Sequence, residues 1–419
     1  MNCRFCATPL RDVFLDLGSA PPSNAFLSAE ALSAPETWLP LKLYTCGKCR
    51  LVQVAEIKPH AELFTPDYVY YSSFSTTWLA HAERYVQRVI ERLKLGRDSL
   101  VMEVASNDGY LLQYVAARGI PCVGIEPTAG TAKVAQDKGI ETLCEFFGRS
   151  FAERFVRTRR PADLIVANNV LAHVPDINDF VAGFTAALAP EGVITVEFPH
   201  LLELVTHRQF DTVYHEPFSY FSLQTVRRIF AAHGLRVWDV ERLSTHGGSL
   251  RVWAAHHTSR HVETPAVGAL LAVEAKAGMG DDAFYQGFQQ QADAVKDACL
   301  AFLLEQRRAG RKVAAYGAAA KGNTLLNYAG VKRDLLPYVV DASPHKQGQF
   351  LPGSRIPVVA ETHLRTDRPD YVLILPWNLR EEIMHQLSYI REWGGRFVTA
   401  VPALAVDGAT MSDSHEVSR

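Results

Sequence analysis

Residues 101–112, VMEVASNDGYLL, are the stretch that most limits how this chain can fold. An apolar strand ends in an acidic residue and a turn of small residues, and an apolar helix begins at Tyr110. This order presents backbone N–H groups at the carboxyl end of a strand, where open α/β sheets hold small polar ligands. The stretch therefore predicts an α/β sheet with a ligand site at residues 103–109.

A second predicted strand, residues 122–125, leads into Glu126 and Pro127, about 20 residues after the first turn. A carboxylate at this position usually accepts hydrogen bonds from both hydroxyls of a ribose. The turn lacks the G-x-G-x-x-G spacing, and Asn107 and Asp108 stand where a pyrophosphate needs bare backbone. An adenosyl ligand with an amino-acid tail therefore fits better than a nicotinamide dinucleotide, and a turn without a ligand is the alternative.

The composition indicates a globular protein. With 419 residues, 48% hydrophobic content and a net charge of -2, the chain is long enough for two or three cores. No basic bias points to nucleic acid or to a membrane surface. No run approaches the roughly 18 apolar residues of a membrane span, and we expect a cytoplasmic protein. No heptad repeat or exposed apolar stripe favours an oligomer, so a monomer is compatible with the sequence.

Four cysteines form two C-x-x-C pairs near the N-terminus. They are Cys3, Cys6, Cys46 and Cys49. Disulfides are rare in a reducing cytoplasm, whereas four thiolates can close a tetrahedral shell around Zn²⁺. Because four sulfur ligands leave no position for water, the predicted zinc is structural, and two unrelated surface pairs are the alternative. The other three cysteines, Cys122, Cys144 and Cys299, are expected in the core.

Seven predicted strands alternate with helical patterns between residues 98 and 256. They cover residues 100–104, 122–125, 141–144, 163–167, 193–197, 235–243 and 250–255. Strands separated by helices indicate a doubly wound sheet. The last two strands are joined directly by the loop 244–249, so the seventh is expected to pair antiparallel with the sixth. This order resembles that of class I methyltransferases.

Unusual polar residues follow the predicted strands, where ligands bind in sheets of this type. Histidines of these loops are His173, His200, His215 and His246. A lone histidine is more often structural, but several on one edge, with tyrosines and a glutamate, favour acid–base chemistry. Tyrosines of the segment 67–75 either pack on the zinc module or form one wall of an active site.

A second alternating unit follows a helical connector. Residues 312–316 are a predicted strand, residues 317–324 a small-residue turn into a helix, and residues 338–341 the next strand. A helix N-terminus of this kind suits a phosphate, with Lys321 as the counter-charge. A Rossmann-like support domain without a ligand is the alternative.

With these motifs in view, the chain resembles the S-adenosylmethionine-dependent C-methyltransferases that build 3-C-methyl branches on TDP-linked deoxysugars in antibiotic pathways. The matching motifs are the cysteine pairs, the turn 103–109, the segment 169–176 (NVLAHVPD), Tyr214-His215-Glu216, and the segment 316–321 (YGAAAK). The resemblance implies an α/β protein with a zinc-binding module, a seven-stranded Rossmann-like methyltransferase domain and a C-terminal Rossmann-like domain. The domains are expected at 1–70, 71–257 and 309–405, with a connector at 258–308 and a tail at 406–419.

The family is understood to act on a 4-keto sugar nucleotide, from which a base removes the proton at C3 before methyl transfer. The ketone delocalises the resulting carbanion, so that a base of ordinary strength suffices where donors stabilise the oxyanion. The family pattern ends in Tyr-His-Glu-His, but this chain has Pro217 in place of the last histidine. Either His215, Tyr214 or His173 replaces that base, or the reaction, the acceptor atom or the activity differs. A homologue that binds a sugar nucleotide without C-methylation, and an O- or N-methyltransferase, are therefore alternatives.

The expected site residues fall into three groups. The donor S-adenosylmethionine is expected to contact Glu103, Ala105, Ser106, Asn107, Asp108, Gly109, Glu126, Pro127, Phe146, Asn168 and Asn169. Catalysis is expected from Tyr70, His173, Tyr214, His215 and Glu216. The nucleotide-linked sugar is expected to contact Tyr71, His200, His246, Ser249, Tyr316 and Lys321.

Overall fold

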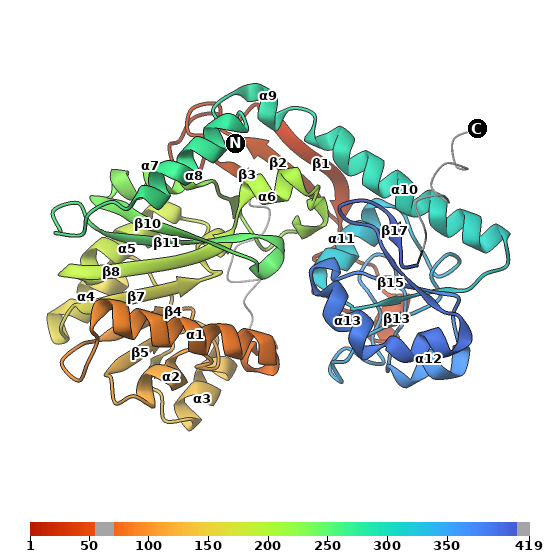
Figure 1. The fold of residues 1–419 in the computed structure, drawn as a ribbon, viewed down its shortest axis with the longest axis horizontal. Coiled ribbons are helices and arrows are strands. Elements are labelled where there is room, and N and C mark those ends of the chain that lie inside the picture. The colour runs from red at the N-terminus through yellow and green to blue at the C-terminus, as the bar shows by residue number, and fades with distance from the viewer. Residues whose placement is uncertain (55–70, 409–419) are drawn as a thin grey trace. The chain divides into compact units, whose positions relative to one another are not determined.

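The computed structural model describes residues 1–54 and 71–408 (Figure 1). Contacts within the chain divide it into two compact units, each assembled from several segments. Unit 1 comprises Met1–Asp12, Thr45–Leu202 and Pro217–Asp282. Unit 2 comprises Val13–Tyr44, Glu203–Glu216 and Ala283–Arg419. The predicted tyrosine at position 70 lies outside the described residues.

Unit 1 is built on a seven-stranded sheet with the order β10-β11-β8-β7-β4-β5-β6. The strands are β4 (Val101–Val104), β5 (Cys122–Ile125), β6 (Thr142–Leu143), β7 (Ala162–Asn168), β8 (Leu188–Pro199), β10 (Leu235–Leu243) and β11 (Ser249–His256). Strands β4 to β8 run parallel to one another, and β11 is antiparallel to both β8 and β10. The predicted class I methyltransferase fold and the antiparallel last hairpin are confirmed.

Helices cover both faces of this sheet because its strands are apolar on both sides. On β7, Leu164 and Val166 join one core while Ile165 and Ala167 join the other, as the two-residue period of a strand requires. One face carries α1 (Thr76–Leu93), α2 (Leu112–Ala116) and α3 (Ala129–Asp137). The opposite face carries α4 (Arg149–Thr158), α5 (Ile177–Ala187), α7 (Leu223–Ala232) and α8 (Pro265–Lys276).

Short elements complete unit 1. Strand β3 (Val52–Val54) pairs antiparallel with β9 (Ser219–Tyr220). The others are η3 (Ser72–Phe74), η4 (Leu171–His173), η6 (Thr245–Gly247) and α6 (Leu201–Thr206), which continues into unit 2. Cys122 is partly buried, but Cys144 is exposed, so its expected place in the core is wrong. The two-residue β6 ends at Leu143, which leaves Cys144 in the following loop.

Unit 2 contains a six-stranded sheet with the order β14-β13-β12-β15-β16-β17. The strands are β12 (Val313–Tyr316), β13 (Val339–Val340), β14 (Val358–Val359), β15 (Tyr371–Ile374), β16 (Arg396–Thr399) and β17 (Ala405–Val406). All pairs are parallel except β16 with β17. The predicted Rossmann-like character of the C-terminal domain is confirmed.

The helices of unit 2 are α9 (Asp282–Tyr285), α10 (Phe288–Arg308), α11 (Ala320–Tyr328), α12 (Thr362–Asp367) and α13 (Arg380–Gln386). Its 3-10 helices are η1 (Glu30–Ser33), η5 (Phe210–Thr212), η7 (Trp377–Leu379) and η8 (Ser388–Trp393). Two neighbouring strands, β1 (Asp12–Ala20) and β2 (Leu39–Thr45), also belong mainly to this unit. Phe14 of β1 stacks on Phe288 of α10 with ring centroids 4.9 Å apart. No helix of the described residues is long and apolar enough to cross a membrane.

Candidate functional site

The two C-x-x-C pairs adopt the same turn. The N–H of Ala7 donates to the carbonyl of Cys3 at 2.9 Å, and the N–H of Arg50 donates to the carbonyl of Cys46 at 2.9 Å. Ala7 and Arg50 both have left-handed backbones, with φ of 58° and 64°. Each turn thereby directs two sulfur atoms to the same side of the chain.

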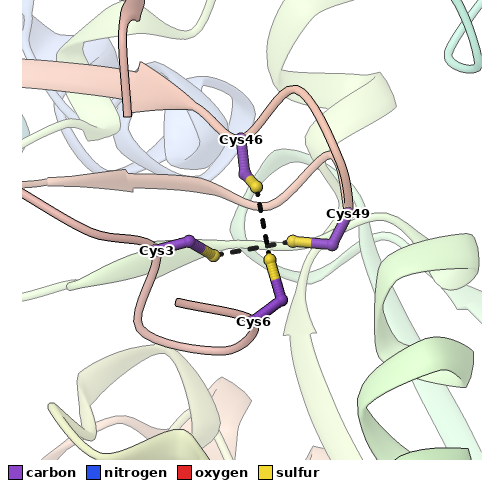
Figure 2. Close-up of side chains that lie close together, drawn as sticks. All are labelled: Cys3, Cys6, Cys46 and Cys49. Atoms are coloured by element: carbon purple, nitrogen blue, oxygen red, sulfur yellow. Dashed lines mark hydrogen bonds between the residues drawn. The ribbon is translucent and has the colours of Figure 1, made fainter. Parts of the chain in front are cut away.

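The four sulfur atoms converge, as Figure 2 shows, and lie within 4.8 Å of one another. Cys3 Sγ is 3.6 Å from Cys49 Sγ, and Cys6 Sγ is 3.5 Å from Cys46 Sγ. A tetrahedral zinc with Zn–S bonds of about 2.3 Å needs sulfur separations of about 3.8 Å. The four thiolates therefore fit Zn²⁺, and the prediction that both pairs meet at one site is confirmed. The side-chain amide of Gln53 donates to Cys3 Sγ at 3.3 Å, which favours a thiolate there.

The turn after β4 is unusually tight. Ala105, Asn107 and Gly109 all have positive φ, at 56°, 50° and 75°. The N–H of Gly109 donates to the carbonyl of Ser106 at 3.0 Å, and a Cβ at position 109 would lie 2.5 Å from Ile140 Cδ1. Backbone curvature and close packing together explain why small residues occupy this turn.

Glu126 at the tip of β5 is fixed against this turn. Its Oε2 accepts from the N–H of Asn107 at 2.9 Å, and its Oε1 accepts from the N–H of Thr128 at 2.9 Å. Each carboxylate oxygen has a second lone pair, so the group can still accept from the two hydroxyls of a ribose. The predicted carboxylate on the neighbouring strand tip is therefore in place.

Buried polar atoms at these strand tips lack hydrogen-bond partners among the described residues. They are Ser106 Oγ and Asp108 Oδ1. The carboxyl of Glu103 and the side chain of Asn168, both buried, contact Tyr110. Burial also raises the pKa of Glu103 well above its ordinary value. Since buried polar groups are normally paired, these acceptors call for a ligand that carries N–H and O–H donors. The ammonium and hydroxyl groups of S-adenosylmethionine fit this demand.

Other residues predicted for the donor lie in the following loops. Asn169 has a left-handed backbone with φ of 54°, and its N–H donates to the carbonyl of Glu197 at 2.8 Å. Phe146 is 49% exposed after β6. Pro127 contributes its carbonyl to a 3.5 Å contact with Cys144 Sγ. The donor contacts of these three residues stay predictions.

Aromatic side chains lie near the turn 103–109, which we call the donor turn after its predicted ligand. The Trp78 ring stacks near Tyr110 at 6.0 Å and meets His246 edge-on at 5.4 Å. Tyr71 contacts Phe74 with ring centroids 5.3 Å apart, and the next N–H, that of Ser72, donates to Asn107 Oδ1 at 2.9 Å. The structure thus places Tyr71 beside the donor turn. Sequence patterns did not single out Trp78, whose signal was only its position at the start of a helix.

Three further residues of unit 1 were predicted for the site, and they differ in how accessible they are. His200 is 1% exposed and lies 2.8 Å from the carboxylate of Glu274, which also accepts from the N–H groups that open α7. Ser249 is buried and donates to the carbonyl of Thr245 at 2.9 Å. His173 ends η4, directly after the tip of β7. In this structure His200 and Ser249 have almost no surface to offer a sugar, whereas His173 is partly exposed.

The residues Tyr214, His215 and Glu216 belong to unit 2. His215 Nε2 is 3.3 Å from the carbonyl of Leu39, so this nitrogen carries the proton and donates. Glu216 accepts from the Asn24 side chain at 2.8 Å, and burial raises the pKa of its carboxyl. The three residues therefore share a unit with Lys321, not with the donor turn.

A second cluster in unit 2 surrounds Lys321. Its Nζ donates to Asn378 Oδ1 at 2.6 Å and lies 4.6 Å from the centre of the Trp377 ring. The indole N–H of Trp377 donates to Asp211 Oδ2 at 2.8 Å. Burial raises the pKa of Asp211 to about 6, and burial lowers the pKa of Lys321 while the charge of Asp211 opposes that shift. The predicted cation, Lys321, is therefore accompanied by the carboxyl group of Asp211. Asp211 is far from Lys321 in the sequence and was not predicted as part of this site.

The turn after β12 has its own acidic strand tip. Asp341 Oδ2 accepts from the N–H of Ala318 at 2.7 Å, and Asp341 Oδ1 accepts from the N–H of Ser343 at 2.8 Å. Lys346 Nζ is 3.5 Å from Asp341 Oδ2. Tyr316, at the end of β12, is buried, and its hydroxyl accepts from Gln386 at 3.0 Å. Asp341 was missed as a site residue, although it ends a predicted strand just as Glu126 follows one.

Family models match three consecutive parts of the chain. Residues 3–64 match a model described as "Putative zinc binding domain", and residues 78–240 match a methyltransferase domain. Residues 244–402 match the C-methyltransferase C-terminal domain. The first model covers the cysteine pairs, the second covers β4 to β8, and the third covers β11 and most of the second Rossmann-like sheet.

Known relatives agree with these matches. The C-methyltransferase NovU of Streptomyces niveus is 35% identical over 404 residues, which cover 96% of this chain and 95% of that protein. Trans-aconitate 2-methyltransferase of Mycobacterium tuberculosis is 22% identical over 225 residues, covering 52% of this chain and 84% of that protein. Magnesium protoporphyrin IX methyltransferase from Synechocystis with bound SAM is 14% identical, covers 47% of this chain and 88% of its own, and has a TM-score of 0.33.

Strand order, the donor turn and the full-length relative agree on one assignment. The protein is an S-adenosylmethionine-dependent methyltransferase with a zinc-binding N-terminal region. Its chain belongs to the C-methyltransferase family that includes NovU of Streptomyces niveus.

Proposed function

We propose that the protein methylates C3 of a TDP-linked 4-keto-deoxysugar, the carbon next to the ketone, through an enolate. The observation that carries the proposal is the pair of acidic strand tips, Glu126 in unit 1 and Asp341 in unit 2. Each suits a nucleoside, and a transfer between a nucleoside-bearing donor and a nucleotide sugar needs two such sites. The name C-methyltransferase of the relative NovU supports carbon as the acceptor atom.

The chain's own residues would bind and orient both partners. S-adenosylmethionine, when bound, supplies an electrophilic methyl group that needs no metal activation. Glu126 would hold its ribose, and the buried polar groups of the turn, Ser106 and Asp108 among them, would hold its ammonium group. Such fixation turns an encounter of two molecules into a step between positioned atoms. The zinc, closed by four cysteines, has a structural role in this reaction.

Unit 2 would bind the sugar nucleotide. Lys321 places a cation at the start of α11, where a diphosphate also meets the backbone N–H groups of the helix. Tyr214, His215 and Glu216, which belong to the same unit, would contact the sugar. Tyr70, Tyr71, His173 and His246 are further candidates to face the sugar. Pro217 has no group that can accept a proton.

A labelled-methyl assay with a panel of 4-keto TDP-sugars tests the function. We expect stable incorporation of the label, with loss of the proton at C3. Label on an oxygen or nitrogen would identify an O- or N-methyltransferase. Binding of the sugar nucleotide without any turnover would favour the alternative that Pro217 motivates, a homologue that binds without C-methylation.

A lysine pair tests the proposed diphosphate site. Lys321→Ala should weaken sugar-nucleotide binding by roughly 10-fold or more, with donor binding unchanged, since a charge-assisted contact is lost. Lys332→Ala is the matched control, because Lys332 lies in the same unit and also over an indole, 5.7 Å from the Trp38 ring. Equal affinities in both variants, measured by calorimetry, would remove Lys321 from the site.

A further inference from the structure

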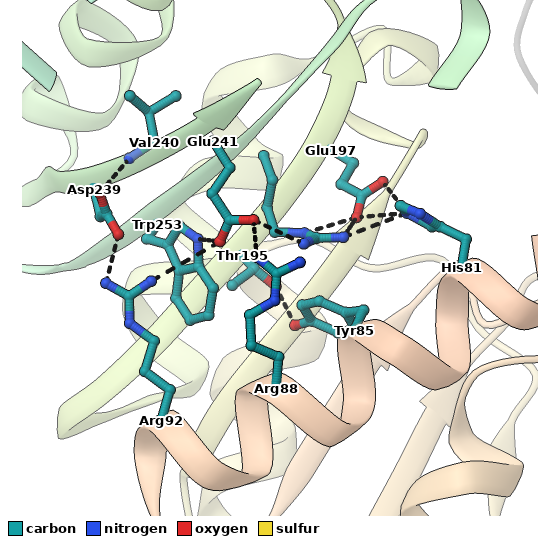
Figure 3. A network of polar contacts seen from close by, with 11 residues as sticks. His81, Tyr85, Arg88, Arg92, Thr195, Glu197, Asp239, Val240, Glu241 and Trp253 are labelled. Atoms are coloured by element: carbon teal, nitrogen blue, oxygen red, sulfur yellow. Dashed lines mark hydrogen bonds and ion pairs between the residues drawn. The ribbon is translucent and has the colours of Figure 1, made fainter. Parts of the chain in front are cut away.

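Unit 1 contains a charged network beneath α1, which is buried at its centre and exposed at its rim (Figure 3). Three arginines and three carboxylates form it: Arg88, Arg92, Arg251, Glu197, Asp239 and Glu241. The innermost pair is Arg251 and Glu197, whose side chains are each 1% exposed. Arg251 Nε donates to Glu197 Oε1 at 2.8 Å. Positive and negative groups are equal in number, so the network is neutral without any further proton.

His81 is the seventh titratable member. Its Nε2 lies 3.0 Å from Glu197 Oε2 and 3.2 Å from Glu197 Oε1. Burial raises the pKa of Glu197, but His81 and Arg251 outweigh it and hold that pKa below its ordinary value. Glu197 therefore stays charged and can stabilise an imidazolium, as a carboxylate does for the histidine of a catalytic triad.

The imidazole lies at the edge of the sheet that carries the donor turn. It stacks on Trp78 at 4.9 Å, and Trp78 lies against Tyr110, the residue directly after Gly109. The side chain of His81 is 13% exposed, whereas that of Glu197 is 1% exposed. Glu197 is thus closed off from solvent, whereas His81 is partly exposed near the donor turn. The hydrogen bonds of His81 to the described residues all use Nε2, which leaves Nδ1 for a ligand.

We propose that His81 is the proton acceptor of this enzyme and that Glu197 is its positioning residue. The inference rests on the proposed function and identifies the base that Pro217 cannot be. The C3–H bond of the sugar breaks, its electron pair stays on the substrate as the enolate, and the proton moves to His81 Nδ1. The enolate carbon then bonds to the methyl group, whose former electron pair remains on the sulfur of the donor.

A purely structural role is the competing explanation, because the pair also ties α1 to β8. The groups that face His81 are Glu197 on β8, Arg251 on β11 with Nη2 3.3 Å away, Trp78 on α1, and through Trp78 both Tyr110 and His246. Glutamine separates the two roles. Its amide N–H can still donate to Glu197, but it cannot accept a proton.

The test measures exchange of the C3 proton in D₂O, with a TDP-4-keto-sugar and S-adenosylhomocysteine, and methyl transfer in a parallel assay. His81→Gln should lower both rates by about 100-fold or more with donor affinity unchanged, as expected for loss of a general base. Imidazole added to His81→Ala should restore part of the exchange. His261→Gln is the matched control, since His261 also stacks on a tryptophan, Trp238, at 4.8 Å in the same unit.

Each outcome decides between the claims. Wild-type exchange that persists in His81→Gln overturns the role of His81 and leaves the proposed function standing. Exchange lost in His81→Gln but kept in His261→Gln supports it. A wild-type protein that neither exchanges nor methylates any sugar of the panel overturns the proposed function, and the role of His81 falls with it.

Discussion

The two Rossmann-like units fix their first turns in the same way. In unit 1, Glu126 accepts from the N–H of Asn107 and from the N–H of Thr128, two residues beyond itself. In unit 2, Asp341 does the same with Ala318 and with Ser343, also two residues beyond itself. An acidic residue at the tip of the second strand thus shapes the first turn of each sheet.

The polar groups around the two turns are opposite in character. The first is surrounded by buried acidic and polar groups, with Glu103, Asp108 and Asn168 among them. The second opens into α11 with the cation Lys321. Acceptors suit the ammonium and hydroxyl groups of a methyl donor, whereas a cation at a helix N-terminus suits phosphate. The same backbone arrangement therefore carries side chains that suit two different kinds of ligand.

The largest expected effect concerns the glycines of the two turns. Gly109→Ala would place a Cβ 2.5 Å from Ile140, and Gly317→Ala would place one 2.4 Å from Pro376, both at positive φ. Left-handed strain and overpacking together should cost about 2–5 kcal/mol in the free energy of unfolding. Gly119→Ala and Gly330→Ala are controls, because they share the positive φ but meet none of the described atoms within 4 Å. If urea unfolding gave the same loss of stability for these variants as for their controls, neither turn would be tightly packed.

A pH-dependent effect should distinguish the cation-bearing turn. Asp211 has a folded pKa of about 6, above its ordinary value, so its protonated form is the one that stabilises unit 2. This contribution to the free energy of unfolding is complete below about pH 4 and is lost as the pH rises through about 6. The total loss is up to about 3 kcal/mol. Asp211→Asn should remove that loss, whereas Asp334→Asn, on the surface of the same unit, should not. Parallel pH profiles of urea unfolding for both variants would contradict the claim that burial raises the pKa of Asp211.

The smallest expected effect concerns the strained turn of unit 1. Ala105 has φ of 56°, a conformation that costs an L-residue about 1–2 kcal/mol and costs glycine little. Ala105→Gly should therefore raise the thermal midpoint by a few degrees, in line with about 1 kcal/mol. Ala318→Gly in the other turn is the comparison, since Ala318 is not among the residues with positive φ. A lower midpoint for Ala105→Gly would show that the strain is absent.

Local patterns were sufficient to predict the sheet of unit 1 and its turn. Strand spacing placed Glu126 beside residues 103–109, and the direct loop before Ser249 predicted the antiparallel hairpin. The cysteine spacing predicted the four-sulfur cluster. Each of these features depends on residues close in sequence or on a rule that parallel strands obey.

Contacts between residues that are far apart in the sequence could not be predicted from local patterns. Asp211 meets Trp377, which lies 166 residues further on, and His200 meets Glu274, 74 residues further on. Arg251 sits on a strand whose neighbours are apolar, yet it is buried because Glu197 lies opposite it on β8. The sequence shows the charges but not which partners the fold brings to them.

Calorimetry with two ligands and two variants tests the division between the units most directly. We expect Glu126→Gln to lower the affinity for S-adenosylhomocysteine by about 10–100-fold and to leave TDP binding unchanged, since a hydrogen bond to a charged group is lost. We expect the reverse for Asp341→Asn. Loss of both ligands in either variant, or loss of neither in both, would contradict the claim that each acidic strand tip holds its own nucleoside.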